Sequence, residues 1–110
     1  MATIVVVDPG KIWLDFLCGL FGDNGCGVMP FTNLADAKVA LETNLVDLII
    51  CEATVLEPGD GILWARELLA RGQRAVLLAY SGSHRGNDPK ILSKAAINAN
   101  LPAQLLELLT

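Results

Sequence analysis

The chain has 110 residues, which is enough for one domain spanning residues 1–110 and too short for two. Apolar residues make up 53% before glycine is counted, against about 45–50% with glycine in an ordinary domain. The chain therefore has a large buried core or an apolar surface kept for a partner. Eight lysines and arginines against twelve acidic residues give a net charge of -4, which argues against nucleic acid and anionic lipid as main ligands.

The sequence carries no sign of a membrane anchor, a disulfide framework or a zinc site. No apolar run approaches the length of a membrane span, and the N-terminal residues lack the basic region and cleavage site of a signal peptide. Cys18, Cys26 and Cys51 form no CxxC pair, and the only histidine, His84, lies in a Ser/Gly/Arg segment typical of solvent-exposed loops. We expect a cytoplasmic protein with reduced cysteines and no contact with membranes.

The first predicted unit is a buried strand followed by a helix. Residues 4–7 form an unbroken β-branched run that ends at Asp8-Pro9-Gly10, a pattern typical of strands buried on both faces of a parallel sheet. Apolar residues then recur at helical spacing over residues 12–21, and Gly22-Asp23-Asn24-Gly25 provides the stop.

A short extended segment at residues 27–31 precedes a second helix. Asn33 and Asp36, three positions apart, predict an N-cap and its capping-box partner. One apolar face of this helix is predicted from Leu34, Ala37, Leu41 and Leu45.

Two further buried strands are predicted at residues 47–51, ending at Glu52, and at residues 75–80, ending at Ser81. Between them, apolar spacing predicts a helix over residues 62–69 that closes at Arg71-Gly72. Asp8, Glu52 and Ser81 thus all lie at the carboxyl ends of strands, where sites gather in doubly wound sheets.

The last part of the chain departs from this alternation. Only nine residues, 82–90, separate Ser81 from the short apolar segment 91–93, and a parallel crossover usually needs about 10–12. A closing helix follows, with Asn100 as the expected cap and Pro102 in the first turn. The fold class predicted is α/β: a doubly wound, mainly parallel five-stranded sheet of the flavodoxin-like type, with a shortened or missing fourth helix.

Taken together, the strand-end residues resemble those of the CheY-like receiver domains of bacterial two-component response regulators. The resemblance runs through Ile4-Val5-Val6-Val7-Asp8, Asp47-Leu48-Ile49-Ile50-Cys51-Glu52, Pro58-Gly59-Asp60-Gly61, Ser81 and Lys94. In that family an acidic pair after the first strand holds a divalent cation, and an aspartate ending the third strand accepts a phosphoryl group. A serine or threonine and a lysine then contact the phosphate.

The resemblance is incomplete at the positions that carry this chemistry. Asp8 matches the first acid of the pair, but Pro9 replaces the second and removes a carboxylate ligand, so we expect Mg²⁺ binding to be weak or absent. Glu52 stands at the phosphoacceptor position with a longer arm, a displacement that phosphoryl transfer tolerates badly. Ser81 and Lys94 match the phosphate-sensing residues, while Ile91 replaces the aromatic switch residue.

These matches predict an ion pair between Glu52 and Lys94 in a polar cleft. The alternatives are that Asp8 only caps the turn into the first helix, that Glu52 and Lys94 are solvated charges, and that Ser81 only satisfies backbone groups. Trp13 and Trp64 lie at apolar helical positions and are interpreted as core residues, with the alternative that one of them lines an exposed apolar patch.

The function expected is that of a degenerate receiver domain in a phosphorelay, without enzymatic activity, acting through protein–protein contacts. The expected partner is a histidine kinase, another regulator, an output protein or a second copy of the chain. One rival is a small α/β hydrolase-like enzyme that uses Asp8, Glu52 and Lys94. The other rival is a receiver phosphorylated at a different residue.

Overall fold

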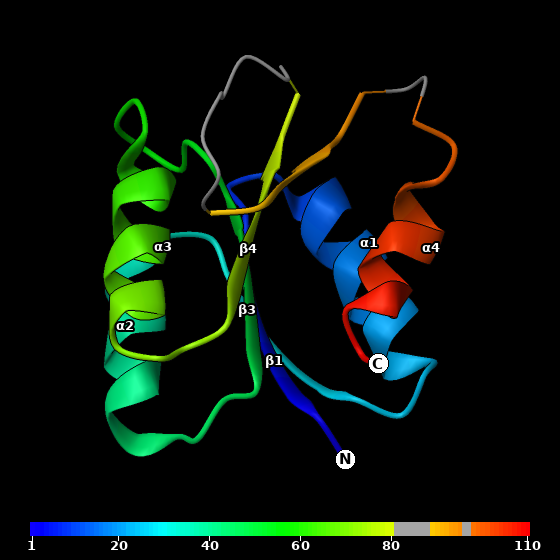
Figure 1. Cartoon of the computed structure of the whole chain (residues 1–110), viewed down its shortest axis with the longest axis horizontal. Coiled ribbons are helices and arrows are strands. Elements are labelled where there is room, and N and C mark those ends of the chain that lie inside the picture. Colours follow the sequence, from blue (N-terminus) through cyan, green and yellow to red (C-terminus); the bar gives the residue numbers. More distant parts are fainter. Residues whose placement is uncertain (81–88, 96–97) are drawn as a thin grey trace.

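A parallel β-sheet lies between two layers of α-helices (Figure 1). This computed structural model describes residues 1–80, 89–95 and 98–110. The strands in these ranges are β1 (Thr3–Val7), β2 (Gly27–Phe31), β3 (Leu48–Glu52), β4 (Ala75–Ala79) and β5 (Ile91–Ser93). The helices in the same ranges are α1 (Lys11–Gly22), α2 (Leu34–Thr43), α3 (Asp60–Ala70) and α4 (Leu101–Glu107).

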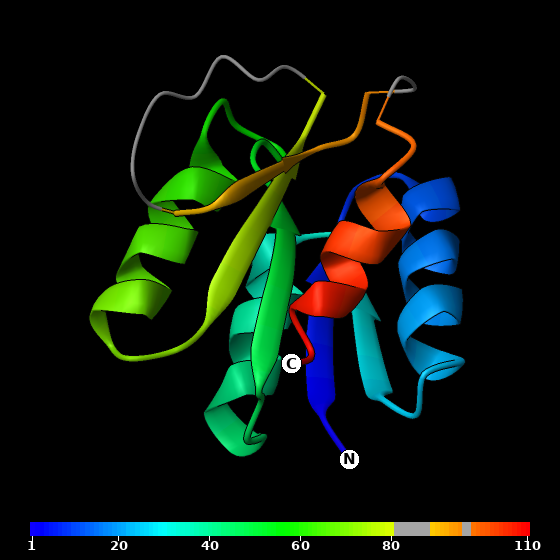
Figure 2. The same ribbon diagram turned by 45° about the vertical axis from the view of Figure 1, so that its right-hand side comes forward.

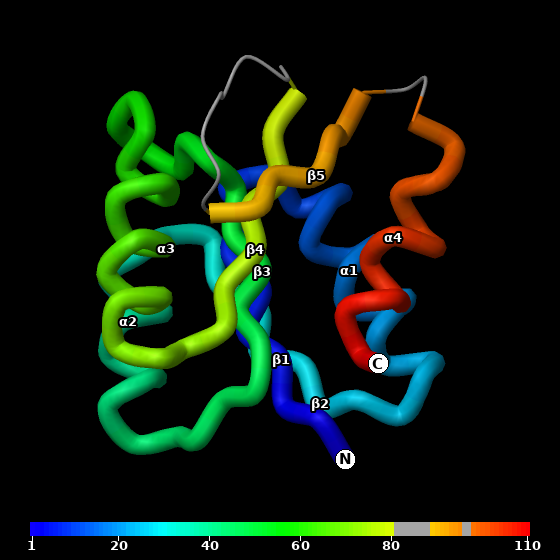
Figure 3. Tube along the Cα trace, viewed as in Figure 1, coloured from blue at the N-terminus to red at the C-terminus, as the bar shows by residue number. Residues whose placement is uncertain are grey.

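The strand order β2-β1-β3-β4-β5 makes the sheet doubly wound (Figure 3). The chain starts in the interior with β1, adds β2 on one side and then β3, β4 and β5 on the other, and all neighbouring pairs run parallel. Because such crossovers are right-handed, reversing the direction of winding places helices on both faces. The predicted α/β fold class is confirmed.

Each face of the sheet has its own apolar core. In Figure 2, α1 and α4 lie side by side on one face, and α2 and α3 cover the other. Ile4 and Val6 of β1 pack toward α1 and α4, whereas Val5 and Val7 pack toward α2 and α3. This alternation explains the unbroken β-branched run, since both faces of the strand are buried. None of the helices in the described part of the chain is long and apolar enough to cross a membrane.

Helix α2 begins as predicted and ends earlier. The Asn33 side chain accepts a hydrogen bond from the Asp36 backbone N–H at 2.8 Å and donates one to the Asp36 carboxylate at 3.0 Å, which confirms the cap. The placement of Leu45 on the apolar face is wrong, because its side chain is 98% exposed. Asn44 is in an extended conformation and donates its side-chain amide to the Ala40 carbonyl, which ends the helix before Leu45.

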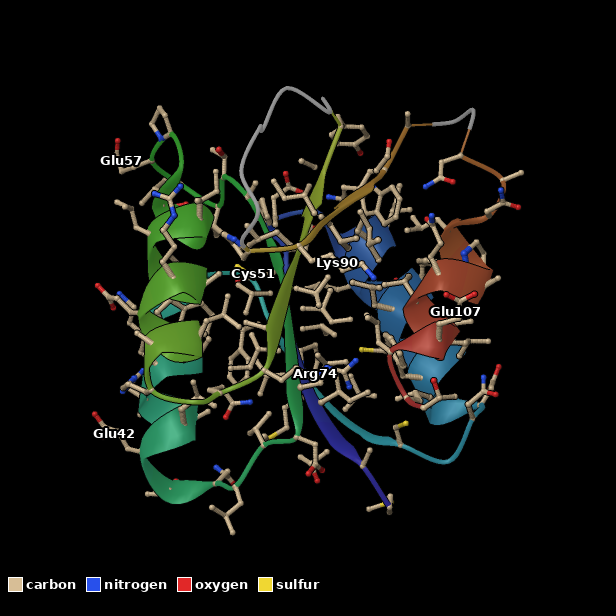
Figure 4. The ribbon with its side chains drawn as sticks, viewed as in Figure 1. Glu42, Cys51, Glu57, Arg74, Lys90 and Glu107 are labelled. Atoms are coloured by element: carbon tan, nitrogen blue, oxygen red, sulfur yellow. The ribbon has the colours of Figure 1, made fainter. Side chains whose placement is uncertain are left out.

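Helix α4 begins after Asn100, as expected, but without the expected side-chain cap. Asn100 is in a helical conformation, and its side chain makes no capping hydrogen bond. At the other end of α4, Arg74 donates from its guanidinium to the Leu108 carbonyl, which ties the helix to the base of the sheet (Figure 4). The shortened or missing helix predicted between β4 and β5 falls on residues 82–90, of which 82–88 lie outside the described residues.

Candidate functional site

Three charged side chains from the carboxyl ends of different strands meet at one place. Asp8 follows β1, Glu52 ends β3 and Lys94 follows β5. The Lys94 Nζ lies 2.5 Å from the Asp8 Oδ2 and also donates to the Glu52 Oε2. The predicted Glu52–Lys94 ion pair is therefore present, and Asp8, which that ion-pair prediction did not include, is bonded to the same ammonium. We refer to Asp8, Glu52 and Lys94 as the charge cluster.

The charge cluster is buried. Asp8 is 2% exposed and Lys94 is 4% exposed, so the interpretation of Lys94 as a solvated surface charge is wrong. Glu52 is more accessible than either partner but is still partly buried. With both carboxylates ionised, the cluster carries one negative charge more than positive, in an environment where every charge requires a close partner.

The two oxygens of Asp8 serve two different contacts. Oδ1 accepts a hydrogen bond from the Gly10 backbone N–H at 2.7 Å, which is the turn-capping role considered for this residue. Oδ2 contacts Lys94. The capping role and the ion pair thus coexist. Pro9 lies between Asp8 and Gly10 in the sequence. It is exposed, and its side chain has no ligand atom for a cation.

Glu52 is held in an environment that disfavours its charge. Burial raises the pKa of the Glu52 carboxyl above its ordinary value of 4.5, the Asp8 carboxylate raises it further, and Lys94 opposes the rise. The Glu52 backbone is fixed by a close approach of α3, because a Cβ at Gly61 would lie 2.0 Å from the Glu52 carbonyl oxygen. Only glycine fits at this position without movement of the backbone.

The loop between β3 and α3 is organised by Asp60. Its carboxylate accepts hydrogen bonds from the backbone N–H groups of Val55, Leu56 and Glu57 at 2.7, 3.0 and 3.0 Å. Desolvation alone would raise the pKa of Asp60, but these bonds lower it below its ordinary value of 3.8. The segment that follows Glu52 is therefore held by the Asp60 carboxylate, and the Thr54 hydroxyl accepts one further hydrogen bond, from the Gly59 N–H at 3.0 Å.

Two aromatic rings cover the charge cluster on the side of α1. The Lys94 Nζ lies 4.6 Å from the Trp13 ring centroid and 4.9 Å from the Tyr80 ring centroid. One side of the expected polar cleft is thus lined by aromatic rings. Trp13 is partly buried and packs against the core, whereas Trp64 is 3% exposed, which confirms its core position. Sequence periodicity placed Trp13 on an apolar helix face, but it did not show the contact with Lys94.

A pocket opens beside these rings between α1 and α4. It measures about 510 Å³, and its lining includes Ile12, Trp13, Phe16, Tyr80, Lys94 and Leu101. Three of the six aromatic residues of the chain are therefore found at one pocket, next to the charge cluster.

Of the remaining residues that the sequence analysis singled out, the structure describes Ile91 but not Ser81 or His84. Ile91 is the first residue of β5, is partly buried and packs with the core on the side of α2 and α3. The predictions for Ser81 and His84 lie outside the described residues.

The charge cluster does not fit a divalent cation well. Both carboxylates that face this place are bonded to the Lys94 ammonium, so a cation between them would have to displace it. Mg²⁺ also requires near-octahedral oxygen ligands. Within residues 1–80, 89–95 and 98–110, no group of three histidine, cysteine or acidic side chains is placed to hold a metal ion.

Comparison with solved structures identifies the fold. The chain is similar to the response regulator TrrA from Thermotoga maritima, solved in complex with Mg²⁺ and BeF, with a TM-score of 0.80 and 18% identity over 98% of this chain and 99% of that one. It is similar to the chemotaxis protein CheY4 of Vibrio cholerae, with a TM-score of 0.79 and 18% identity over 99% and 96% of the two chains. A CheY-like receiver domain from Methylobacillus flagellatus matches with a TM-score of 0.77 and 15% identity over 98% of each chain.

These similarities show that the chain has the CheY-like receiver fold. Among protein-family models and among curated proteins, none matches this sequence.

Proposed function

We propose that this chain is an atypical receiver domain that acts as a protein-interaction module in two-component signalling, without conventional phosphorylation. The observation that carries the proposal is the Lys94 ammonium bonded to both Asp8 and Glu52. In a phosphorylatable receiver the corresponding carboxylates hold a cation and accept a phosphoryl group. In this chain the lysine at the phosphate-sensing position is bonded to both carboxylates, so a cation would have to displace its ammonium.

Two residue identities support the same proposal. Pro9 provides no ligand where the family has the second acid, and Glu52 carries the carboxylate one methylene further from the backbone than an aspartate would. In-line phosphoryl transfer depends on placing the attacking oxygen, the cation and the phosphorus in one geometry. Both changes disturb that geometry.

The charge cluster is a poor candidate for an enzyme active site. Asp8 and Lys94 are buried and bonded to each other, which leaves a substrate little access to either group. Burial raises the pKa of the neighbouring Cys51 thiol, and the Asp60 and Glu52 carboxylates add to the rise, so this cysteine is not an activated nucleophile. We therefore propose a binding module rather than a hydrolase.

A phosphodonor experiment tests the proposal. The wild-type chain and a variant carrying Pro9→Asp and Glu52→Asp are each incubated with acetyl phosphate and Mg²⁺, and intact mass and acid lability are measured. The wild type is expected to gain no phosphoryl group. The double variant, which restores both acids, is the matched control for labelling. Stoichiometric acid-labile phosphorylation of the wild type would refute the proposal, and peptide mapping would identify the residue modified.

A further inference from the structure

We propose that Trp13 and Tyr80 are positioning residues that hold the Lys94 ammonium between Asp8 and Glu52. The inference deepens the proposed function, because it concerns what keeps the charge cluster closed. It rests on the contacts of the Lys94 ammonium with its neighbours on the two sides of the cluster.

The carboxylates use only part of the bonding capacity of Lys94. A lysine ammonium has three N–H donors, and two of them meet Asp8 and Glu52. The rings of Trp13 and Tyr80 lie within 4.9 Å of the nitrogen, inside the range of a cation–π contact. The part of the ammonium that faces away from the carboxylates therefore contacts aromatic rings, and at 4% exposure the residue has little contact with water.

The two rings are also fixed to each other. The Trp13 Nε1 donates a hydrogen bond of 2.6 Å to the Tyr80 hydroxyl, and the rings meet edge to face with centroids 6.1 Å apart. Phe16 supports Trp13 from one turn further along α1, again edge to face, at 5.7 Å. Trp13 from α1 and Tyr80 from the end of β4 thus form one unit over Lys94, which we call the aromatic cover.

The aromatic cover extends from the charge cluster to the surface. Tyr80 is 63% exposed, and Trp13 lines the pocket between α1 and α4. Nothing in the charge cluster itself reaches the surface to this extent. The aromatic cover therefore connects the exposed surface with the buried Lys94.

Competitive acylation of the lysines tests the role of the cover. The intact chain is treated with a limiting amount of an acetylating reagent, and the rate at Lys94 is measured by mass spectrometry. Lys11, Lys38 and Lys90 serve as internal standards. The variants are Tyr80→Leu and Trp13→Leu, which remove a ring, and Tyr80→Phe, which keeps the ring and loses the hydroxyl. Phe16→Leu is the matched control, because Phe16 lines the same pocket and contacts Trp13.

We expect Lys94 to be the slowest lysine in the wild type. Loss of either ring is expected to raise its rate about tenfold relative to Lys11, the factor that a partly desolvated cation–π contact supports. Tyr80→Phe and Phe16→Leu are expected to keep most of the protection. If Trp13→Leu fails to fold, as judged by circular dichroism, Tyr80→Leu decides the result, since its side chain is largely exposed.

Unchanged protection of Lys94 in a folded Tyr80→Leu variant would overturn the inference. The inference would also be overturned if Phe16→Leu raised the acylation rate of Lys94 as much as the loss of Trp13 or Tyr80 does. General loosening of the pocket would then explain the effect. Neither result changes the outcome expected from the phosphodonor experiment on the wild type. The inference about the aromatic cover can therefore be refuted without refuting the proposed function.

Discussion

At the scale of single residues, Lys94 determines whether two carboxylates can be buried together. A buried ion pair adds little net stability, since the loss of hydration offsets the attraction, but removal of one partner leaves an uncompensated charge. Asp8 is especially sensitive, because it is 2% exposed and its Oδ2 has Lys94 as its partner.

Replacement of Lys94 by the similarly shaped but neutral methionine measures this dependence. Lys94→Met is expected to lower the free energy of unfolding by about 3–5 kcal/mol, as measured by urea denaturation at neutral pH. The control is Lys11→Met, because the Lys11–Asp15 pair is exposed and its loss is expected to cost no more than about 0.5 kcal/mol. Similar losses in the two variants would show that burial of the charge cluster is unimportant.

The pH dependence of stability reports on Glu52. Because burial raises the pKa of this carboxyl in the folded chain, the folded state binds the proton more tightly than the unfolded state. The contribution of Glu52 to the free energy of unfolding is therefore greatest below its ordinary pKa of 4.5, and it is lost as the pH rises through the folded value.

Glu52→Gln removes this titration. Between about pH 4.5 and pH 7 the wild type is expected to lose stability relative to the variant, as followed by thermal unfolding at several pH values. A wild type that instead gains stability relative to the variant over this range would mean that attraction to Lys94 outweighs desolvation.

At the scale of the elements, the contact of α3 with the end of β3 sets the position of Glu52. Gly61→Ala would place a methyl group 2.0 Å from the Glu52 carbonyl oxygen and 3.0 Å from the Ala53 carbonyl oxygen, and both are backbone atoms. We expect a loss of about 3 kcal/mol in urea denaturation. The control is Gly19→Ala in α1, where no atom lies within 4 Å, and it is expected to stabilise the chain by about 0.5–1 kcal/mol. A tolerated Gly61→Ala would contradict the described approach of α3.

At the scale of the whole molecule, the sequence was sufficient for the elements and their order. Apolar runs and glycine stops located the strands and helices to within one or two residues, because burial on two faces produces a distinct pattern. The incorrect predictions concern helix ends, where the presence or absence of one side-chain hydrogen bond determines the structure. Asn44 ends α2 through its bond to Ala40, and the Asn100 side chain does not cap α4.

The candidate site was predictable in its acids and its lysine, because all three follow strand ends that meet at one edge. The aromatic cover was not predictable. It joins residues 67 positions apart, and helical spacing places Trp13 on an apolar face without indicating which residue it contacts. Likewise, the burial of Lys94 depends on the positions of the Trp13 and Tyr80 rings, which the sequence pattern does not predict.

The central claim is that the Lys94 ammonium holds the place where a phosphorylatable receiver binds a divalent cation. Calorimetric titration of the wild-type chain with Mg²⁺ tests this claim most directly. The account predicts no saturable binding in the millimolar range, because the cation would have to displace a buried ammonium and would find a proline at position 9. Saturable Mg²⁺ binding at millimolar or lower concentration that is lost on Asp8→Asn would contradict it.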